Sequence, residues 1–267
     1  MNNNRISVLM GIYNCATTLQ EALDSLYAQT YQNFKIILCD DGSKDGTLKI
    51  AESNAMAHSD KVILIKNDRN RGLNYTLNHC LEYADTEYCA RMDGDDISMS
   101  ERFEKEIRFL DEHKEYAVVS SPMIHFDEKG DFRCGKGKGE IEEMDFVKGS
   151  PICHAPSMSR TAVIKSVGGY SVEDKLLRVE DYHLWFKIFA AGYKLYMLDE
   201  CLYKMRDDRS ASARRNWMAR RNEAYVKHIG YKMIGLPWRY QVFAIIPLLK
   251  YLCPNFIYQY IHRTIGR

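Results

Sequence analysis

The chain has 267 residues, of which 46% are hydrophobic and 27% are charged. This composition is ordinary for a globular protein, excludes a low-complexity chain, and provides enough core for one large α/β domain or two small ones. The net charge of +1 conceals an asymmetry, because residues 202–267 contain 13 Lys and Arg but only 3 Asp and Glu. We therefore expect an anionic partner for this basic end, either membrane headgroups or phosphates.

Predicted strands and helices alternate through the first half of the chain. The strands are expected at residues 6–10, 35–39, 62–65 and 87–90. The helices between them are expected at about residues 17–27, 47–57 and 73–83. Thr17 or Thr18 would cap the first helix, with Gln20 and Glu21 placed for a capping box. Continuous apolar strands joined by helices predict a mainly parallel sheet that is covered on both faces.

Polar clusters follow three of these strands. They are Tyr13-Asn14, Asp40-Asp41 and the stretch from Asp93 to Asp96. Ligands of such sheets collect beyond the carboxyl ends of the strands, so the three clusters predict one site on one rim. A carboxylate at the end of a strand can accept the imide N–H of a uracil or a ribose hydroxyl. No GxGxxG or GxxxxGK[ST] motif is present, so neither a dinucleotide fingerprint nor a P-loop is indicated.

The acidic stretch Arg91-Met92-Asp93-Gly94-Asp95-Asp96 places three carboxylates within four residues. Such carboxylates repel each other unless a cation or a basic group compensates them. Their oxygen atoms suit Mg²⁺ or Mn²⁺, which usually take further ligands from water and substrate phosphates. The alternative is a solvated acidic turn.

Four stretches in this order resemble family 2 glycosyltransferases of the GT-A fold, in particular the bacterial polysaccharide and lipopolysaccharide branch. They are residues 12–14, 40–43, 70–73 and 90–96, and the resemblance covers roughly residues 5–215. It implies an α/β GT-A fold and an inverting hexosyltransferase. Such an enzyme uses a nucleotide sugar, most often a UDP-sugar, together with Mn²⁺ or Mg²⁺. The acceptor would be a growing surface glycan (capsule, O-antigen or lipopolysaccharide), either a saccharide or a lipid-linked saccharide.

The resemblance also implies roles for individual residues of the rim. Asp41 resembles the residue that reads the uracil, with Tyr13 beside the base. Asp93 and Asp95 resemble the metal-binding pair, with Asp95 as the direct ligand. Four further residues are expected on the donor side: Asn14, Arg71, Arg91 and Asp96.

The second half of the chain has a different pattern of predicted elements. A helix is expected at residues 102–112, a core strand at 117–121 and a hairpin at 124–132. The Gly/Lys-rich segment 134–139 predicts either a flexible loop over the site or a phosphate cradle. Two prolines within residues 150–157 predict a fixed extended segment, and a further strand is expected at residues 194–198.

A Glu180-Asp181 pair precedes an apolar helix face that includes Trp185. Carboxylates at this position can simply complement the helix dipole. The resemblance instead identifies Asp181 as the general base that takes a proton from the acceptor hydroxyl, with Glu180 positioning the acceptor. It also places His154 and Trp185 on the acceptor side. A hydrolase would need an additional acid for the leaving oxygen, and the acidic cluster does not supply one.

Arg206 and Arg209 are expected to contact the donor diphosphate, the alternative being a solvated basic turn. Residues 237–265 mix aromatic and basic side chains, without the roughly 18 to 20 uncharged residues of a spanning helix. We expect this segment to lie peripherally on the cytoplasmic face of the inner membrane. The alternatives are packing on the domain and a homodimer contact. No nucleic-acid module is visible, so no nucleic-acid partner is expected.

The eight cysteines show no zinc spacing, and no signal-peptide segment precedes the first strand. We therefore expect a reduced, cytoplasmic setting.

The expected organisation is a catalytic domain over 1–215, divided into a nucleotide-binding half (1–97) and an acceptor-binding half (98–215). A basic, aromatic helical extension follows over 216–267. One rival is a sugar-1-phosphate nucleotidyltransferase, which should carry a Gly-rich basic loop after the first strand that residues 11–15 lack. The other is a non-catalytic nucleotide-sugar-binding protein of the same fold.

Overall fold

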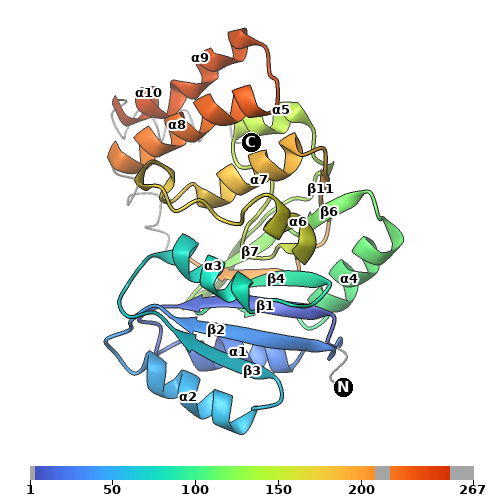
Figure 1. Cartoon of the computed structure of the whole chain (residues 1–267), viewed down its shortest axis with the longest axis vertical. Coiled ribbons are helices and arrows are strands. Elements are labelled where there is room, and N and C mark those ends of the chain that lie inside the picture. The colour runs from blue at the N-terminus through green and yellow to red at the C-terminus, as the bar shows by residue number, and fades with distance from the viewer. Residues whose placement is uncertain (1–3, 208–216, 253–267) are drawn as a thin grey trace.

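A large twisted sheet forms the centre of the computed structural model, which describes residues 4–207 and 217–252 (Figure 1). Its eight strands have the order β3-β2-β1-β4-β10-β6-β11-β9. They are β1 (Ile6–Ile12), β2 (Phe34–Asp40), β3 (Val62–Lys66), β4 (Tyr88–Asp93), β6 (Tyr116–Ser120), β9 (Gly139–Glu140), β10 (Met158–Arg160) and β11 (Lys194–Met197). Strands β1 to β4 are mutually parallel, and β11 is parallel to β6. Strand β10 runs antiparallel between β4 and β6, and β9 antiparallel to β11. The prediction of a mainly parallel sheet is confirmed.

A second sheet of four strands has the order β5-β12-β7-β8. Its strands are β5 (Ile97–Ser98), β7 (Met123–Asp127), β8 (Gly130–Cys134) and β12 (Tyr203–Arg206). The predicted hairpin corresponds to β7 and β8, which pair antiparallel. Strand β12 lies between β5 and β7, and it brings a distant part of the chain beside the acidic stretch that ends β4.

Helices cover both faces of the large sheet (Figure 1). The helices of the described residues are α1 (Leu19–Tyr27), α2 (Thr47–Ala57), α3 (Leu73–Glu82), α4 (Arg102–Glu112), α5 (Glu143–Lys148), α6 (Thr161–Ser166), α7 (Glu180–Ala190), α8 (Trp217–Met233), α9 (Gln241–Ala244) and α10 (Ile246–Leu252), with 3₁₀ turns η1 (Asp174–Leu176) and η3 (Trp238–Tyr240). Helices α8 to α10 lie beyond α7, away from the sheet (Figure 1). Within β1, Val8 joins the buried cluster that contains Leu23 of α1. The adjacent Leu9 joins the opposite cluster, which contains Leu77 of α3. The continuous apolar strands are therefore buried on both sides, as predicted.

Two local expectations need correction. The Thr18 hydroxyl makes no capping bond to α1 and donates instead to the Gly94 carbonyl at 2.9 Å, so the predicted capping box is absent. Thr18 has φ −121° and ψ −21°, which is not the extended conformation that a capping residue usually adopts. The segment 150–157 is not uniformly extended, because the Ser157 N–H donates to the His154 carbonyl at 3.0 Å and closes a turn.

Helix α8 shares the hydrophobic core of α7. A Cβ added at Gly230 of α8 would overlap the ring of Phe186 on α7, so the two helices approach closely. The Asn222 side chain donates to the carbonyls of Asp174 and Leu177 at 3.1 Å each, and the Lys227 ammonium donates to the Val147 carbonyl at 3.1 Å. The predicted C-terminal extension thus begins with a helix anchored to the preceding residues. No helix within the described ranges combines the length and hydrophobicity that a bilayer crossing requires.

Candidate active site

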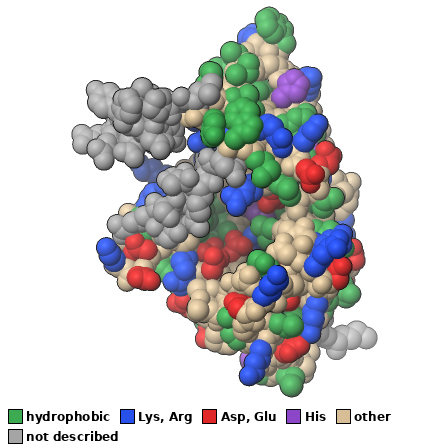
Figure 2. Space-filling model, turned by 90° about the vertical axis from the view of Figure 1, so that its left-hand side faces the viewer, with side chains coloured by type: hydrophobic (Ala, Val, Ile, Leu, Met, Phe, Trp, Pro, Cys, Tyr) green, Lys and Arg blue, Asp and Glu red, His purple; other side chains and the backbone are tan. Residues whose placement is uncertain are grey.

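The three predicted polar clusters meet at the carboxyl ends of β1, β2 and β4. In the sheet register, Ile12 lies opposite Asp40 and Gly11 lies opposite Asp93. Asn14 ties two of the loops together, because its backbone N–H donates to the Ser43 hydroxyl (3.1 Å) and its side-chain oxygen accepts the Lys44 N–H (2.8 Å). Asn14 adopts a positive φ of 49°, a conformation that Asn tolerates better than most residues. Figure 2 shows acidic side chains gathered in a hollow of this face.

Asp41 organises the loop that follows β3. Its buried carboxylate accepts hydrogen bonds from the Asn67 side chain (2.8 Å) and from the backbone N–H groups of Arg71 (2.8 Å) and Gly72 (2.9 Å). The next residue, Gly42, has φ 73°, and an added Cβ would lie only 2.8 Å from the Arg69 backbone, so the close approach requires glycine.

A cavity of about 200 Å³ opens beside this carboxylate. It is lined by Gly11, Ile12, Tyr13, Asp41, Asn70, Gly72, Leu73 and Thr76. Tyr13 is partly exposed at 43%, so its ring is available to a bound group. The predicted base-reading residue and its aromatic neighbour thus line the same cavity.

Strand β12 holds the acidic loop in place. The Asp93 N–H donates to the Tyr203 hydroxyl at 3.1 Å, and the Asp96 carboxylate accepts the Arg206 N–H at 2.8 Å. The Arg206 guanidinium donates to the Asp95 carbonyl at 3.0 Å. Burial, together with the charges of Asp93 and Asp95, raises the pKa of Asp96 to about 8. Asp96 is buried, whereas the side chains of Asp93 and Asp95 reach solvent.

Arg91 interacts with the acidic stretch 93–96 and with the carboxylates of Glu180 and Asp181. Its guanidinium is only 4% exposed and pairs with the Asp93 carboxylate at 2.5 Å. Its Nε and Nη1 atoms have no hydrogen-bond partner within the described part of the chain. Its positive charge also favours the ionised forms of Glu180 and Asp181. The buried guanidinium of Arg91 thus acts on both the acidic loop and the predicted base.

Glu180 and Asp181 occupy the first turn of α7, where the helix dipole favours carboxylates. Burial raises the pKa of Asp181, and burial with the Asp181 charge raises the pKa of Glu180 to about 7. One Glu180 oxygen is buried without a partner among the described residues. Arg178, just before the helix, has φ 66°, a strained conformation for a residue with a side chain. Raised carboxylate pKa values and local strain are frequent at catalytic sites.

His154 and Trp185 pack against each other, and Trp185 lies on α7, the helix that Glu180 and Asp181 begin. The His154 Nε2 atom lies 2.8 Å from the Tyr170 hydroxyl, and burial lowers the pKa of His154 well below its usual value, so the ring is neutral. Trp185 is fully buried, with its ring centroid 5.9 Å from that of His154. Trp185 is therefore a core residue of α7, and its ring has no surface open to an acceptor in this structure.

The arginines that were predicted on the donor side differ in their placement. Arg71 lies over the Tyr75 ring at 4.3 Å and 3.8 Å from Asp68. Arg206 pairs with Glu21 at 2.5 Å while it holds the acidic loop. Arg209 lies outside the described residues.

Sequence reasoning missed two residues that support the site. They are Tyr203, which bonds the Asp93 N–H, and Arg102, whose guanidinium lies over the Tyr203 ring at 5.2 Å and donates to the Arg91 carbonyl at 2.9 Å. Arg102 also pairs with Glu106 in full burial, and burial raises the pKa of Glu106 to about 7. No motif marks these residues, because their contacts join segments that are distant in the sequence.

The carboxylates of Asp93 and Asp95 suit a hard divalent cation in donor type and accessibility. No group of three or more His, Cys, Asp or Glu residues is arranged to hold a metal within the ranges the structure describes. Mg²⁺ and Mn²⁺ in proteins usually take further ligands from water and substrate phosphates.

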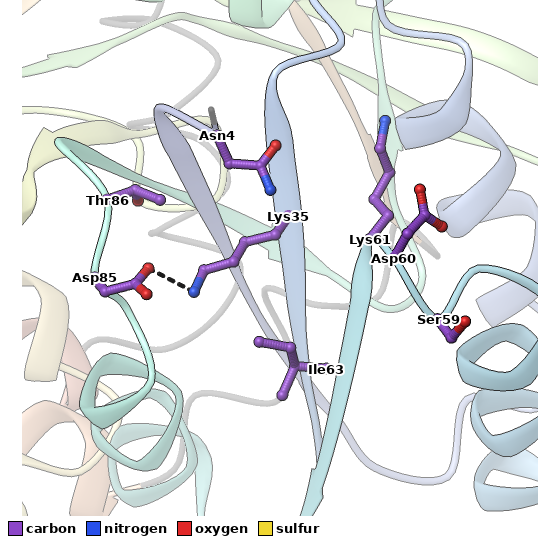
Figure 3. A pocket seen from close by; sticks show the side chains of 8 residues that line it. All are labelled: Asn4, Lys35, Ser59, Asp60, Lys61, Ile63, Asp85 and Thr86. Carbon is purple, nitrogen blue, oxygen red and sulfur yellow. Dashed lines mark ion pairs between the residues drawn. The ribbon is translucent and has the colours of Figure 1, made fainter. Parts of the chain in front are cut away.

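A second cavity, of about 400 Å³, lies at the opposite, amino-terminal edge of the parallel strands (Figure 3). Its Lys35 pairs with Asp85 at 2.6 Å, and its Lys61 donates to the Gln32 side chain at 2.7 Å. Because these lysines already have partners, this cavity is not the favoured anion site.

Comparisons with known proteins agree with this geometry. The family model described as Glycosyl transferase family 2 matches residues 7–163. EpsE of Bacillus subtilis (strain 168), which is named as a glycosyltransferase, is 38% identical over 97% of this chain and 93% of its own. The UDP-Glc:alpha-D-GlcNAc-diphosphoundecaprenol beta-1,3-glucosyltransferase WfaP of Escherichia coli is 28% identical over 71% of this chain and 72% of its own.

Two solved structures show the same fold. Residues 1–349 of TarS from S. aureus, in complex with UDP, match with a TM-score of 0.69 and 19% identity, over 93% of this chain and 70% of that one. The mannosyltransferase PcManGT from Pyrobaculum calidifontis, in complex with GDP-Man and Mn²⁺, matches with a TM-score of 0.66 and 20% identity, over 92% of this chain and 74% of that one. The predicted GT-A fold is thus confirmed.

Proposed function

The chain belongs to glycosyltransferase family 2, and we propose that it transfers a sugar from a UDP-sugar to a hydroxyl group of a growing surface glycan, with inversion at the anomeric carbon. The observation that carries this proposal is the position of buried Arg91, which pairs with Asp93 and also acts on Glu180 and Asp181. One buried cation thus interacts with the acidic loop proposed to hold the metal and with the carboxylate pair proposed to act on the acceptor, which supports a single shared site.

Asp181 is the proposed general base. Its raised pKa makes it a stronger proton acceptor than an ordinary carboxylate. As the acceptor oxygen attacks the anomeric carbon, its proton passes to Asp181, and the bond to the donor diphosphate breaks with its electron pair on the departing UDP. Glu180 would position the acceptor. A single displacement from the face opposite the leaving group inverts the anomeric centre.

The residues that line the smaller cavity support a UDP-sugar as the donor. Tyr13 offers a ring face to a base, and Asp41 offers carboxylate oxygens beside it. The presence of UDP in the TarS structure and UDP-Glc in the name of WfaP support this choice. Because PcManGT holds GDP-Man, GDP is the competitor that the experiment must include.

A divalent cation would be held by Asp95 and Asp93. Bound there with the donor, it would neutralise charge on the diphosphate leaving group. Hydrogen bonds with Tyr203 and Arg206 hold the backbone of the acidic loop in place. Mn²⁺ in the PcManGT structure supports this assignment.

Calorimetric titration with UDP and GDP, with and without Mn²⁺, tests the donor and metal proposals together. We expect metal-dependent UDP binding in the wild type, loss of that binding in Asp95→Asn, and wild-type binding in Asp85→Asn, which alters an exposed carboxylate at the far edge of the sheet. Asp181→Asn should bind UDP normally and lose transfer. Tighter binding of GDP than UDP would overturn the donor assignment, and binding of neither nucleotide would overturn the proposed reaction.

We further propose that the C-terminal helices rest on an anionic membrane surface, where a lipid-linked acceptor would lie. The exposed side chains Trp238, Val242, Ile245 and Leu249 recur at helical spacing, and Trp238 is 86% exposed. Exposed Arg239 and Lys250 flank this stripe. Apolar and aromatic side chains beside basic ones favour the headgroup region. The diphosphoundecaprenol acceptor in the name of WfaP supports this proposal.

Sedimentation with vesicles tests it. The wild type should sediment with phosphatidylglycerol vesicles more than with phosphatidylcholine vesicles, and added salt should weaken the binding. The double variant Trp238→Ala/Leu249→Ala should bind less. Met56→Ala, which removes an exposed apolar side chain from α2, is the matched control. Equal sedimentation of the double variant and the wild type would contradict the proposed surface.

A further inference from the structure

Two cysteines from distant parts of the sequence meet at the edge of the second sheet. Exposed Cys134 ends β8, and partly buried Cys201 precedes β12. Their sulfur atoms lie 2.7 Å apart. Both thiols also face the Gly135 carbonyl, Cys134 at 3.4 Å and Cys201 at 3.8 Å. A covalent bond of about 2.05 Å between the two sulfur atoms therefore requires only a small displacement.

Solvent access distinguishes this pair from another pair in the same chain. Cys39 and Cys80 also interact with each other, but both are fully buried in the core between β2 and α3. A dissolved oxidant cannot reach them in the folded protein. Cys134 is exposed, so it can meet such an oxidant directly.

We propose that Cys134 and Cys201 form a redox-active dithiol, which small disulfides such as glutathione disulfide oxidise to an intramolecular disulfide. Cys134 attacks first because it is the exposed member. Burial and the neighbouring Cys134 raise the pKa of Cys201, which favours its thiol form while Cys134 is still reduced. Cys201 is thereby suited to the second step.

The chemistry balances as two thiol–disulfide exchanges. The Cys134 thiolate attacks one sulfur of glutathione disulfide, breaks its S–S bond and releases one glutathione thiolate. The Cys201 thiol then loses its proton to solvent, and its sulfur attacks the Cys134 sulfur and releases the second glutathione. Both cysteines are oxidised, and one glutathione disulfide is reduced to two glutathione molecules.

The bond would connect the hairpin edge to the strand that holds the acidic loop. Cys201 lies two residues before Tyr203, whose hydroxyl accepts the Asp93 N–H. Cys134 leads into residues 135–138, of which Gly137 packs closely on Leu198 and Asp199, just before Cys201. Oxidation would therefore fix residues 135–138 against the segment before β12.

Mass spectrometry of the whole protein tests this proposal without any measurement of sugar transfer. The folded protein is equilibrated in buffers of increasing glutathione disulfide to glutathione ratio, free thiols are alkylated, and non-reduced peptides are mapped. We expect one dominant cross-linked species that joins Cys134 to Cys201, with a loss of two hydrogen masses that dithiothreitol reverses. Cys153→Ser, which removes a partly buried cysteine outside the pair, should retain this cross-link.

Cys134→Ser should prevent any change, and Cys201→Ser should stop at a glutathione adduct on Cys134. Circular dichroism verifies that each variant is folded. A wild type that stops at a stable glutathione adduct would overturn the proposal. A cross-link between Cys134 and Cys201 that appears only in urea, together with a cross-link between Cys39 and Cys80, would also overturn the proposal.

Discussion

Replacing Asp41 by Asn changes the acceptor that organises the loop after β3. In the wild type one carboxylate oxygen accepts N–H groups from Asn67 and Arg71, and the other accepts the Gly72 N–H. An amide supplies only one oxygen, so at least one N–H group must face an NH₂ group. In the better of the two amide orientations, the Gly72 bond is lost and the other two bonds lose their charge.

The cost can be worked from these contacts. A hydrogen bond to a charged group contributes about 1.5–3 kcal/mol, and a neutral one about 1 kcal/mol. Losing one charged bond while weakening two others to neutral strength predicts destabilisation by about 2.5–7 kcal/mol. With an m value of about 3 kcal/mol/M, the urea midpoint should fall by about 1–2 M.

Urea unfolding followed by circular dichroism measures this change, and Asp40→Asn is the matched control. Asp40 is the adjacent buried carboxylate, but it accepts only the Ser43 N–H, at 3.1 Å, and its other oxygen has no partner among the described residues. An amide can place its NH₂ group at that vacant position, so the control should change stability by less than about 1 kcal/mol. Equal losses in the two variants, or no loss in Asp41→Asn, would refute the hydrogen-bond reasoning.

Three further predictions concern the buried charges and the helix contact. Because burial raises the pKa of Glu180 from 4.5 to about 7, the wild type should lose stability as pH rises through this window. The variant Glu180→Gln should match the wild type below pH 4.5 and melt at a higher temperature above pH 7. Identical melting curves of the two proteins at all pH values would contradict this pKa shift. Arg102→Met leaves Glu106 buried without its partner and should lower the free energy of unfolding by about 3–5 kcal/mol, measured with urea at pH 8. The double variant Arg102→Met/Glu106→Leu should recover most of this loss. No recovery in the double variant would count against the pairing. Gly230→Ala should destabilise the protein by about 1–3 kcal/mol, because the added Cβ overlaps Phe186. Gly46→Ala is the control and should change stability much less, because its Cβ would meet Ala16 at an ordinary 3.5 Å. Similar shifts of the melting temperature in both variants would refute the close-contact explanation.

The rim of the site could be predicted because its signals are local in the sequence. Apolar runs identify β1, β2 and β4, and the residues that follow them must share one edge of a parallel sheet. The limits of α2 and α4 agree with the predicted ranges of 47–57 and 102–112. In these helices a regular apolar pattern and the tertiary packing favour the same boundaries.

The support of the site could not be predicted in this way. Tyr203 reaches Asp93 across 110 positions, and β10 joins β4 through only three residue pairs. Such short strands contain too few residues for a periodic pattern. The burial of Trp185 was also invisible, because an aromatic residue on a helix face has the same local signature whether it lines a pocket or fills the core. The hydrogen bond from Thr18 to Gly94 replaced a local cap by a tertiary contact.

The contact of α8 with α7 makes the C-terminal helices a rigid spacer. Gly230 allows Phe186 to fill the space between these two helices, and the His228 ring of α8 lies 2.9 Å from the Gln241 side chain of α9. The exposed stripe on η3, α9 and α10 is therefore held in a fixed orientation relative to Glu180 and Asp181, which begin α7. On a membrane, this spacer would set the height of the base above the lipid headgroups. Acceptors would then be selected by how far their hydroxyl group extends from the bilayer, in addition to the identity of the sugar.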